Sequence, residues 1–354
     1  MQKYIAPAAA GSMDLPSAAS LKARVRDFAK RCAEFRGADE KRALIQILTT
    51  AVPFALIVGL MLGTLEQAYW LTLLLAFPAS GLVVRFFIIQ HDCGHGSFFR
   101  SRWANDTMGR AMSLFTVAPY GLWRRVHAKH HAGSGNLDRR GFGDIKTLTV
   151  SEYLALPRTA RFRYRIYRHP AFLFLIGVPL FFMVLQRLPW GHGLSARDAW
   201  RSVVGLDIAL IVVYGAVASM IGLKPLLMVG LPICLIASAV GGWLFYIQHQ
   251  FEDAHWRPDE EWDFQTAAVY GSTYYALPPL LNWFTGNIGL HHIHHLNSMI
   301  PNYRLQDCLV ACPELETVNR LTLRESLECV RFALWDEGRG KLVGFRDVAA
   351  ARNC

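Results

Sequence analysis

The chain has 354 residues, of which 53% are hydrophobic and only 18% are charged, and its formal net charge is +10. Soluble domains carry about a quarter of their residues as charged side chains, so this composition excludes an ordinary soluble domain and indicates a surface that partly faces lipid. The basic residues concentrate between two apolar stretches, which is typical of the cytoplasmic face of a membrane protein and argues against nucleic acid as a partner. The seven cysteines form no CxxC pair and are expected to be reduced thiols.

Residues 1–44 are expected to form a cytoplasmic or interfacial segment ahead of the membrane part. They contain no continuous apolar stretch followed by a small-residue cleavage site, so no secretory signal is expected. The pattern at 20–45 predicts a charged amphipathic helix that lies on the membrane surface. Its apolar side would consist of Leu21, Val25, Phe28 and Phe35.

Four long apolar runs predict two transmembrane hairpins. The runs at 45–63 and 68–90 each come near the roughly 20 residues that a spanning helix needs. Only TLEQ lies between them, without Lys or Arg, so the turn should lie outside and both ends of the hairpin should return to the cytoplasm. The runs at 204–223 and 225–247 are long enough to form the second hairpin.

A fifth apolar run, at 171–186, is shorter and contains Pro179. If it crossed the bilayer fully, the parity of crossings would place everything after residue 250 outside. We therefore expect a re-entrant or interfacial helix there, or a crossing compensated by residues 108–122. The expected fold is an all-α integral membrane helical bundle, with a membrane domain at 45–310 and a cytoplasmic helical extension at 311–354.

Three histidine clusters stand out in this apolar chain. In HDCGH, His91 and His95 lie one helical turn apart and share a face if the second apolar run continues as a helix. HAKHH and HHIHH both place histidines at i, i+3 and i+4, which is again one face of a helix. Imidazoles at such spacings can chelate one metal ion. The clusters together predict a metal site formed by His91, His95, His127, His130, His131, His291, His294 and His295.

The other five histidines comprise one further candidate ligand and four residues with other roles. His249 ends the last apolar run, at the depth where the first cluster begins, and is expected as a ninth ligand. His292 is rotated by about 100° from its neighbours on the helix, so it is expected to point away from the site. His169, His192 and His255 are expected to be structural.

The number of imidazoles bears on the kind of metal site. Eight or nine neutral imidazoles exceed what one ion accepts, and two ions with four to five ligands each fit the count. Imidazole suits iron, copper and zinc, so the ligand type alone leaves the metal open. Because the clusters lie where apolar helices end, a lipid-like substrate is expected rather than a water-exposed hydrolytic site. Two redox-active irons could take up electrons one at a time and use O2 to oxidise an unactivated methylene.

The clusters and the hairpins between them resemble the membrane fatty acid desaturase family over nearly all of residues 45–310. The strings HDCGHGSFF, HAKHHAGSGNLDRRGFGDIKTLTVSEY, QHQFEDAHW and GNIGLHHIHHLNSMIPNYRL are similar to the acyl-lipid omega-6 (delta-12) branch. The resemblance implies a non-haem di-iron site with the eight cluster histidines as ligands, and similarity to the acyl-CoA branch makes His249 the ninth. It also implies a reaction that uses O2 and two external electrons to convert a CH2–CH2 pair into a cis double bond and releases water.

The resemblance also suggests an electron donor and supporting residues. The chain lacks the HPGG motif of a fused cytochrome b5 domain, so electrons are expected from a separate ferredoxin-type carrier that docks on the arginine-rich surface. Asp92, Asp144 and Glu252 lie in stretches that match the family and are candidates to hold a ligand histidine through its distal N–H. For Asp144, an ordinary surface position is an equal alternative.

The expected function is therefore an O2-dependent membrane desaturase at the inner (cytoplasmic) membrane, with the clusters on the cytoplasmic side. It would act on a lipid-linked acyl chain, with oleoyl to linoleoyl (delta-12) as the first choice of product. A hydroxylase, epoxygenase, conjugase or carotenoid oxygenase could use the same site and capture the carbon radical with oxygen. A metal or haem transporter is a rival of another class, but transporters usually bind their cargo near the middle of spanning segments, whereas these clusters follow such segments.

Overall fold

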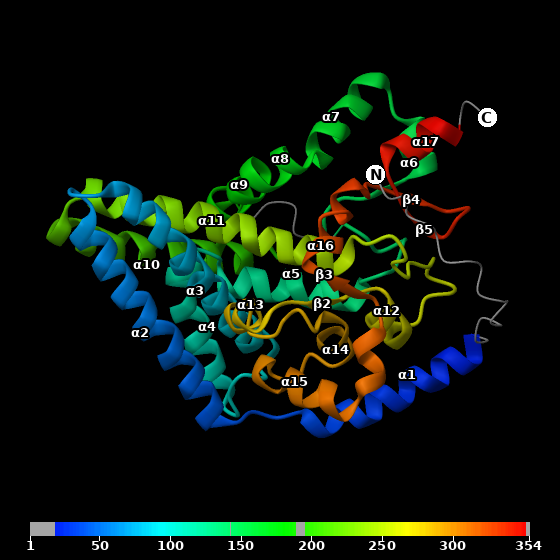
Figure 1. Ribbon diagram of the computed structural model, residues 1–354, viewed down its shortest axis with the longest axis horizontal. Coiled ribbons are helices and arrows are strands. Elements are labelled where there is room, and N and C mark those ends of the chain that lie inside the picture. Colours follow the sequence, from blue (N-terminus) through cyan, green and yellow to red (C-terminus); the bar gives the residue numbers. More distant parts are fainter. Residues whose placement is uncertain (1–17, 142, 189–194, 352–354) are drawn as a thin grey trace, which may run out of the picture.

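The computed structural model describes residues 18–141, 143–188 and 195–351, and it is predominantly helical, at 71%. The expected all-α membrane bundle is confirmed in this respect, and the described strands are all short. Five segments of the described chain are long and apolar enough to cross a membrane. The two hairpins lie at one end of the molecule, and the polar elements and both ends of the described chain lie at the other (Figure 1).

The first hairpin consists of α2 (Glu40–Thr64) and α3 (Tyr69–His95). The side chain of Asp39 caps α2 by accepting a hydrogen bond from the backbone N–H of Arg42, at 3.1 Å. α3 ends where Gly96 adopts a left-handed conformation, with φ 74°. In its most apolar window α3 is 61% buried, against 17% for α2, so α3 is the central helix of the bundle.

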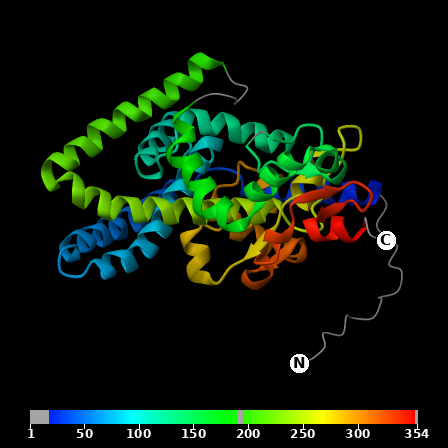
Figure 2. The same ribbon diagram turned by 90° about the horizontal axis from the view of Figure 1, so that it is seen from above.

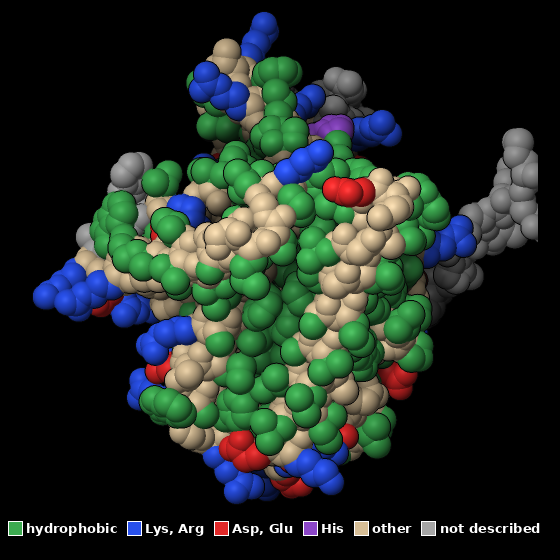
Figure 3. Space-filling model, turned by 90° about the vertical axis from the view of Figure 1, so that its left-hand side faces the viewer, with side chains coloured by type: hydrophobic (Ala, Val, Ile, Leu, Met, Phe, Trp, Pro, Cys, Tyr) green, Lys and Arg blue, Asp and Glu red, His purple; other side chains and the backbone are tan. Residues whose placement is uncertain are grey.

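The second hairpin consists of α10 (Ala196–Ile221) and α11 (Leu223–His249), which turn at Gly222 with φ 89°. These two helices diverge from that turn in the view from above (Figure 2). Large apolar side chains on α10, such as Ile211 and Val212, are exposed, as expected for a surface that contacts lipid. Figure 3 shows the end of the molecule that carries both hairpins, where hydrophobic side chains cover most of the face and Lys and Arg gather at its margin.

The fifth apolar run forms an interrupted helix from Pro170 to Arg187. It comprises α8 (Pro170–Phe172), a π-helical segment η2 (Leu173–Gly177), α9 (Val178–Met183) and a 3-10 turn η3 (Leu185–Arg187). It packs on α11 so closely that a Cβ on Gly242 would lie 2.5 Å from Val178 Cγ1. Its length and composition would allow a crossing. The re-entrant or interfacial placement stays a prediction.

Two helices that follow α3 pack against it. They are α4 (Arg102–Thr116) and α5 (Tyr120–Gly133). The possible compensating crossing at 108–122 is wrong, because Val117 has φ 57° and Pro119 caps α5, so the two helices are separate. A Cβ on Gly109 would lie 2.3 Å from the Tyr120 ring, which shows how closely α4 and α5 meet.

The N-terminal amphipathic helix differs from its expected position. α1 (Ala18–Cys32) and the 3-10 turn η1 (Ala33–Phe35) end before Gly37, which has φ 97° and separates them from α2. Val25 and Phe28 are only 0% and 2% exposed, in a cluster with apolar residues of α14 and α15. The apolar side of α1 therefore packs on the protein rather than on a membrane surface, because the polar end of the molecule offers it a larger apolar partner.

The remaining elements form the polar end of the molecule. They are β1 (Leu148–Thr149), α6 (Val150–Ala155), α7 (Arg158–Arg168), α12 (Phe264–Tyr270), β2 (Tyr274–Ala276), α13 (Pro279–Phe284), α14 (His291–Leu296), α15 (Asn302–Ala311), η4 (Pro313–Thr317), β3 (Arg320–Thr322), α16 (Leu323–Ser326), η5 (Cys329–Arg331), β4 (Leu334–Asp336), β5 (Lys341–Val343) and α17 (Phe345–Ala351).

The C-terminal part contains strands as well as helices. The purely helical extension that its sequence predicts is therefore wrong. β4 pairs with β1 in parallel and with β5 in an antiparallel hairpin, and β3 pairs in parallel with β2. Gly340 in the hairpin turn adopts a left-handed conformation, with φ 63°. Trp335 of β4 stacks on Trp256 with ring centroids 5.4 Å apart. Short strands thus tie the end of the chain to segments that flank the histidine clusters.

Candidate metal centre

The three histidine clusters lie where the helical bundle meets the polar end of the molecule, and each cluster lies on its own helix. His91 and His95 occupy the last turn of α3, and the second and third clusters lie on α5 and α14. His249 is the last residue of α11. These helix ends meet in the interior, and the histidine side chains range from partly to fully buried.

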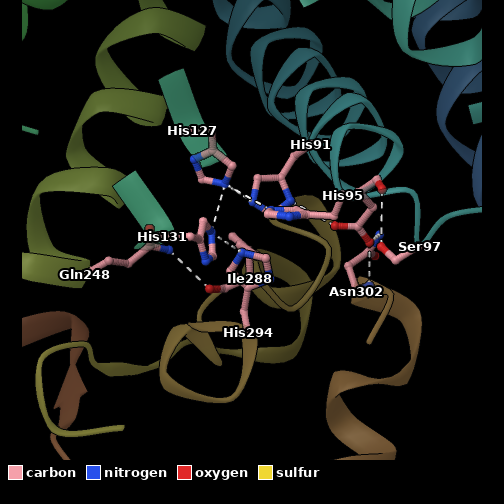
Figure 4. A network of polar contacts seen from close by, with 10 residues as sticks. His91, His95, Ser97, His127, His131, Gln248, Ile288, His294 and Asn302 are labelled. Atoms are coloured by element: carbon pink, nitrogen blue, oxygen red, sulfur yellow. Dashed lines mark hydrogen bonds and ion pairs between the residues drawn. The ribbon is translucent and has the colours of Figure 1, made fainter. Parts of the chain in front are cut away.

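Five of the nine side chains form one group, in which all ligand atoms lie within 4.8 Å of one another. The Nε2 atom of His127 lies 3.0 Å from that of His91, 3.1 Å from that of His95 and 3.0 Å from that of His131. The Nε2 atoms of His131 and His294 are 3.1 Å apart. Figure 4 shows these five imidazoles turned toward a common point from three separate segments of the chain.

The other four side chains form a second group of the same kind. The Nε2 atom of His249 lies 3.1 Å from that of His130 and 3.0 Å from that of His291. The Nε2 atoms of His291 and His295 are 3.0 Å apart. The two groups adjoin through the stacked rings of His131 and His295, whose centroids are 4.1 Å apart.

Carboxylates hold two of these imidazoles by their other nitrogen. His91 Nδ1 lies 2.9 Å from Asp92 Oδ1, and His130 Nδ1 contacts Asp144 Oδ1. Each carboxylate fixes a tautomer that leaves the Nε2 lone pair free. Asn302 was not anticipated from the sequence: its backbone N–H and its Nδ2 donate to Asp92 Oδ2 at 2.6 and 2.8 Å. The only signal for it was its place in the family-like string NSMIPNYRL.

Glu252 does not have the role that was expected for it. Its carboxylate pairs with Lys341 Nζ at 2.7 Å, and its backbone carbonyl accepts from Leu342 N. The prediction that it supports a ligand histidine is wrong, because the β4–β5 hairpin packs beside it and supplies a cation.

The spacing of the nine Nε2 atoms matches that of ligands around metal ions. Metal–imidazole bonds of about 2.1 Å at right angles would place neighbouring nitrogens about 3.0 Å apart, as observed here. Burial, with repulsion from neighbouring imidazoles, holds the pKa values of His127, His131, His291, His294 and His295 well below their usual range, so these rings are neutral and able to bind metal. Converging lone pairs repel, and a cation between them removes that repulsion.

The histidines outside the two groups have other surroundings. His292 points away, and its Nε2 contacts the Leu315 carbonyl at 2.9 Å. Burial lowers the pKa of His255 to about 4, and this residue belongs to neither group. His169 is exposed, and His192 lies outside the described residues.

Apolar and aromatic side chains close the centre on one side. The Phe245 ring lies 5.2 Å from the His130 ring and 5.4 Å from the His249 ring, measured between centroids. A cavity of about 20 Å³ lies beside His249 and Asp144 and also borders Phe245. It is large enough for about one water molecule.

The chain matches known proteins over most of its length. A family model described as fatty acid desaturase matches residues 67–316. A fatty acid desaturase of Bacillus subtilis is 40% identical over 324 residues, which cover 91% of each chain. An sn-1 oleoyl-lipid 12-desaturase of Anabaena variabilis is 24% identical over 81% of this chain and 79% of its own, and an sn-1 acyl-lipid omega-3 desaturase (ferredoxin) of Nostoc is 26% identical over 71% and 68%.

Proposed function

The chain belongs to the fatty acid desaturase family, and from that premise we propose that it holds two irons and introduces a cis double bond into a lipid-linked acyl chain. The observation that carries the proposal is the division of nine buried imidazoles into adjoining groups of five and four. The first group would hold one iron and the second group the other. The overall conversion takes up O2, two electrons and two protons and releases two waters for each double bond.

The side chains around the centre have separable roles in this reaction. Two bound irons would supply the binding and reduction of O2 and the oxidation of the substrate C–H bonds. Asp92 and Asp144 would keep His91 and His130 in the tautomer that presents Nε2 to the metal. Phe245 would exclude water from the second group, which protects a reactive oxidant from side reactions.

Electrons would come from a separate acidic carrier of the ferredoxin type. Helix α7 carries Arg158, Arg163 and Arg165 as exposed residues and contains no acidic residue. A positive surface of this kind steers an acidic partner toward it. Relatives that are named ferredoxin-dependent support the same donor class.

The finer specificity rests on relatives of lower identity. Two sn-1 oleoyl-lipid 12-desaturases, at 24% and 27% identity, favour an oleoyl chain and a new bond at position twelve. The relative at 40% identity is named only as a fatty acid desaturase. An acyl chain carried by a glycerolipid follows from the same two 12-desaturases.

The parts of the chain would divide as the sequence suggests. Residues 45–310 would form the membrane desaturase domain, with 1–44 and 311–354 as segments on its cytoplasmic side. The histidines would lie on the cytoplasmic side of the inner membrane, because the arginine-rich α7 follows the second cluster in sequence. Labelling of single added cysteines with a membrane-impermeant reagent on sealed vesicles of known orientation tests this sidedness.

One experiment separates the proposed function from its rivals. The chain is expressed in a host that supplies ferredoxin and oleate-containing lipids, and its fatty acids are analysed by gas chromatography with chemical location of the double bond. Linoleate that disappears with His130→Ala supports the proposal, whereas a bond at another position corrects the specificity alone. A hydroxy or epoxy acid would favour oxygen capture, and purified protein without about two irons per chain would favour a transporter or a zinc site.

A further inference from the structure

A second cavity, of about 360 Å³, lies between the start of α2, the middle of α3 and α13. Its wall includes Arg42, Gln46, Arg85, Trp283, Asn287 and Tyr303, and none of the nine histidines lines it. No carboxylate is among its described lining residues, so guanidinium and amide groups dominate its polar surface. Its volume is near the lower end of the about 300–1,000 Å³ of small-ligand sites, which suits a headgroup rather than an entire lipid.

Arg85 is a charged residue within a membrane-spanning helix, and it is only 8% exposed. Its Nε donates to Thr50 Oγ1 at 3.1 Å, and its Nη1 donates to the Trp283 carbonyl. Its guanidinium carbon also lies 4.3 Å from the centroid of the Trp283 ring. These partners are all neutral, and within the described ranges no carboxylate forms an ion pair with it. A buried charge without a counter-charge is costly, so an anion from outside the chain would stabilise Arg85.

Gln46 is a second buried polar group on the cavity wall. It is 3% exposed, and neither its Oε1 nor its Nε2 has a hydrogen-bond partner in the described part of the chain. An unsatisfied buried polar group is costly, and both atoms are shielded in this conformation, so a ligand would recover that energy by bonding the amide once the side chain turns into the cavity. Arg42 lies one helical turn earlier on α2, and its charge is already balanced by Asp307 at 2.5 Å. Arg85 is therefore the uncompensated cation of the pair.

The surroundings of this cavity indicate the source of the anion. Leu48 of α2 and Leu280 of α13 are 60% and 66% exposed, beside lining residues Thr49 and Pro279. Exposed apolar side chains on spanning and interfacial helices are where lipid tails lie. A polar interior below an apolar rim matches a lipid, whose headgroup enters the cavity while its tails stay outside.

We propose that this cavity binds the phosphodiester headgroup of a membrane phospholipid. Arg85 would donate to the phosphate oxygens, and Gln46 would bond the glycerol part. The cavity adjoins the histidine centre, since Asn302 lines it and also donates to Asp92, which holds His91. The phospholipid would then be the carrier of the acyl chain, a step that rests on the proposed function.

The test uses the full chain, purified in neutral detergent and placed in nanodiscs. Native mass spectrometry compares the retention of phosphatidylglycerol with that of a galactosyl diacylglycerol, which has no phosphate. The wild type should retain phosphatidylglycerol preferentially, and Arg85→Gln should weaken its retention by about tenfold or more. Arg110→Gln, which removes an exposed arginine from α4, is the matched control and should bind as the wild type does.

Two further variants keep the test decisive if Arg85→Gln fails to fold. Arg85→Lys keeps the charge and should retain the lipid, and Gln46→Leu should weaken binding without removing a charge. Equal retention of the neutral galactolipid, or wild-type retention in Gln46→Leu and Arg85→Gln, would overturn the proposal. Competition by millimolar inorganic phosphate or coenzyme A would replace the lipid with a soluble phosphate ligand and would also overturn it.

The lipid test and the desaturation test fail independently. Fatty-acid analysis of the same wild-type preparation reports the reaction, whereas retention of phosphatidylglycerol reports only the cavity. A protein that binds the lipid through Arg85 but forms no new double bond would contradict the proposed function alone. A protein that desaturates but shows no preference for phosphate-bearing lipid would contradict the headgroup site alone.

Discussion

At the scale of single residues, the carboxylates that hold the histidines would determine how readily the proposed centre binds metal. Asp144 contacts His130 Nδ1, and Asp92 contacts His91 Nδ1 while Asn302 bonds its other oxygen. A ligand imidazole that is fixed in one tautomer and orientation loses less freedom when a metal binds. The two contacts reach one histidine in each group, so each metal would have one pre-oriented ligand.

The Asp144 contact predicts a measurable effect on metal binding. Asp144→Asn removes the charge that stabilises the His130 ring, and iron affinity and desaturation should fall by about 10–100-fold. Iron per chain and the yield of unsaturated product check this result. Asp253→Asn, at an exposed position one residue after Glu252, is the control and should leave both quantities unchanged. Full iron and activity in Asp144→Asn would show that the contact is not needed.

His292 and His295 provide a matched pair within one short helix. His292 Nε2 contacts the Leu315 carbonyl, whereas His295 Nε2 lies 3.0 Å from His291 Nε2 in the group of four. His292→Ala should lower the free energy of unfolding by about 1–3 kcal/mol, yet keep the irons. His295→Ala should lose iron from the second group. Thermal unfolding and iron analysis of both variants separate the two roles, and a folded His292→Ala protein without iron would contradict them.

The spacing of residues in the sequence predicts which side chains form the centre, but it does not predict every residue that holds them. The separations i, i+3 and i+4 fix which histidines share a helical face, so the clusters and the outlying His292 were predictable. The position of His249 at the end of an apolar run placed it at the same depth. Glu252 could not be excluded, since its partner Lys341 comes from a hairpin 89 residues later. Contacts between distant segments depend on the fold, and spacing along the chain does not encode them.

At the scale of elements, one close backbone approach positions the third histidine helix. Gly289 accepts a hydrogen bond from Tyr275 N at 2.7 Å, just before α14. A Cβ added at Gly289 would lie 2.5 Å from the Tyr275 carbonyl oxygen, which belongs to the backbone and cannot rotate away. Only glycine therefore fits where the β2 strand and the start of α14 meet.

Gly289→Ala should thus move α14 and weaken the centre. We expect a loss of about 1–3 kcal/mol in stability, as for other overpacked sites, together with reduced iron content. The control is Gly241→Ala in α11, where nothing lies within 4 Å of the added Cβ. Thermal unfolding and metal analysis check the pair. Equal behaviour of the two variants would show that β2 and α14 can separate at no cost.

The elements that the sequence misplaced share a physical reason. The apolar side of α1 was assigned to the membrane, but Val25 and Phe28 pack against residues near 300. The C-terminal strands are three residues long, too short for an alternating pattern to distinguish them from a helix. The sulfurs of Cys32, Cys308 and Cys312 also meet within 4.8 Å, although no pairing motif announces it. The partners of α1, of β3 and of Cys32 lie far away in the sequence, whereas β4 and β5 form a local hairpin.

At the scale of the whole molecule, charge is segregated along the chain. Arginines of α5 pair with acids, as in Arg124–Asp106 and Arg125–Asp198, whereas the exposed arginines of α7 have no acidic residue on their own helix. α7 projects from the side of the bundle toward the polar end, and Lys224 lies where α10 meets α11 at the opposite end (Figure 1). A carrier of negative charge would therefore be attracted to α7.

This asymmetry predicts how electron delivery depends on charge and salt. Replacing Arg158 and Arg163 together by Glu should raise the KM for a reduced acidic ferredoxin by about tenfold at low salt, because charges at an interface rim act mainly on association. The double variant should also lose most of the salt dependence shown by the wild type, since screening then has less attraction to remove. Lys224→Glu makes the same kind of change at the far end and should alter neither quantity. Rates are measured against ferredoxin concentration at salt concentrations from about 50 to about 300 mM, over which the Debye length falls by roughly half. An unchanged KM in the double variant would mean that the donor docks elsewhere.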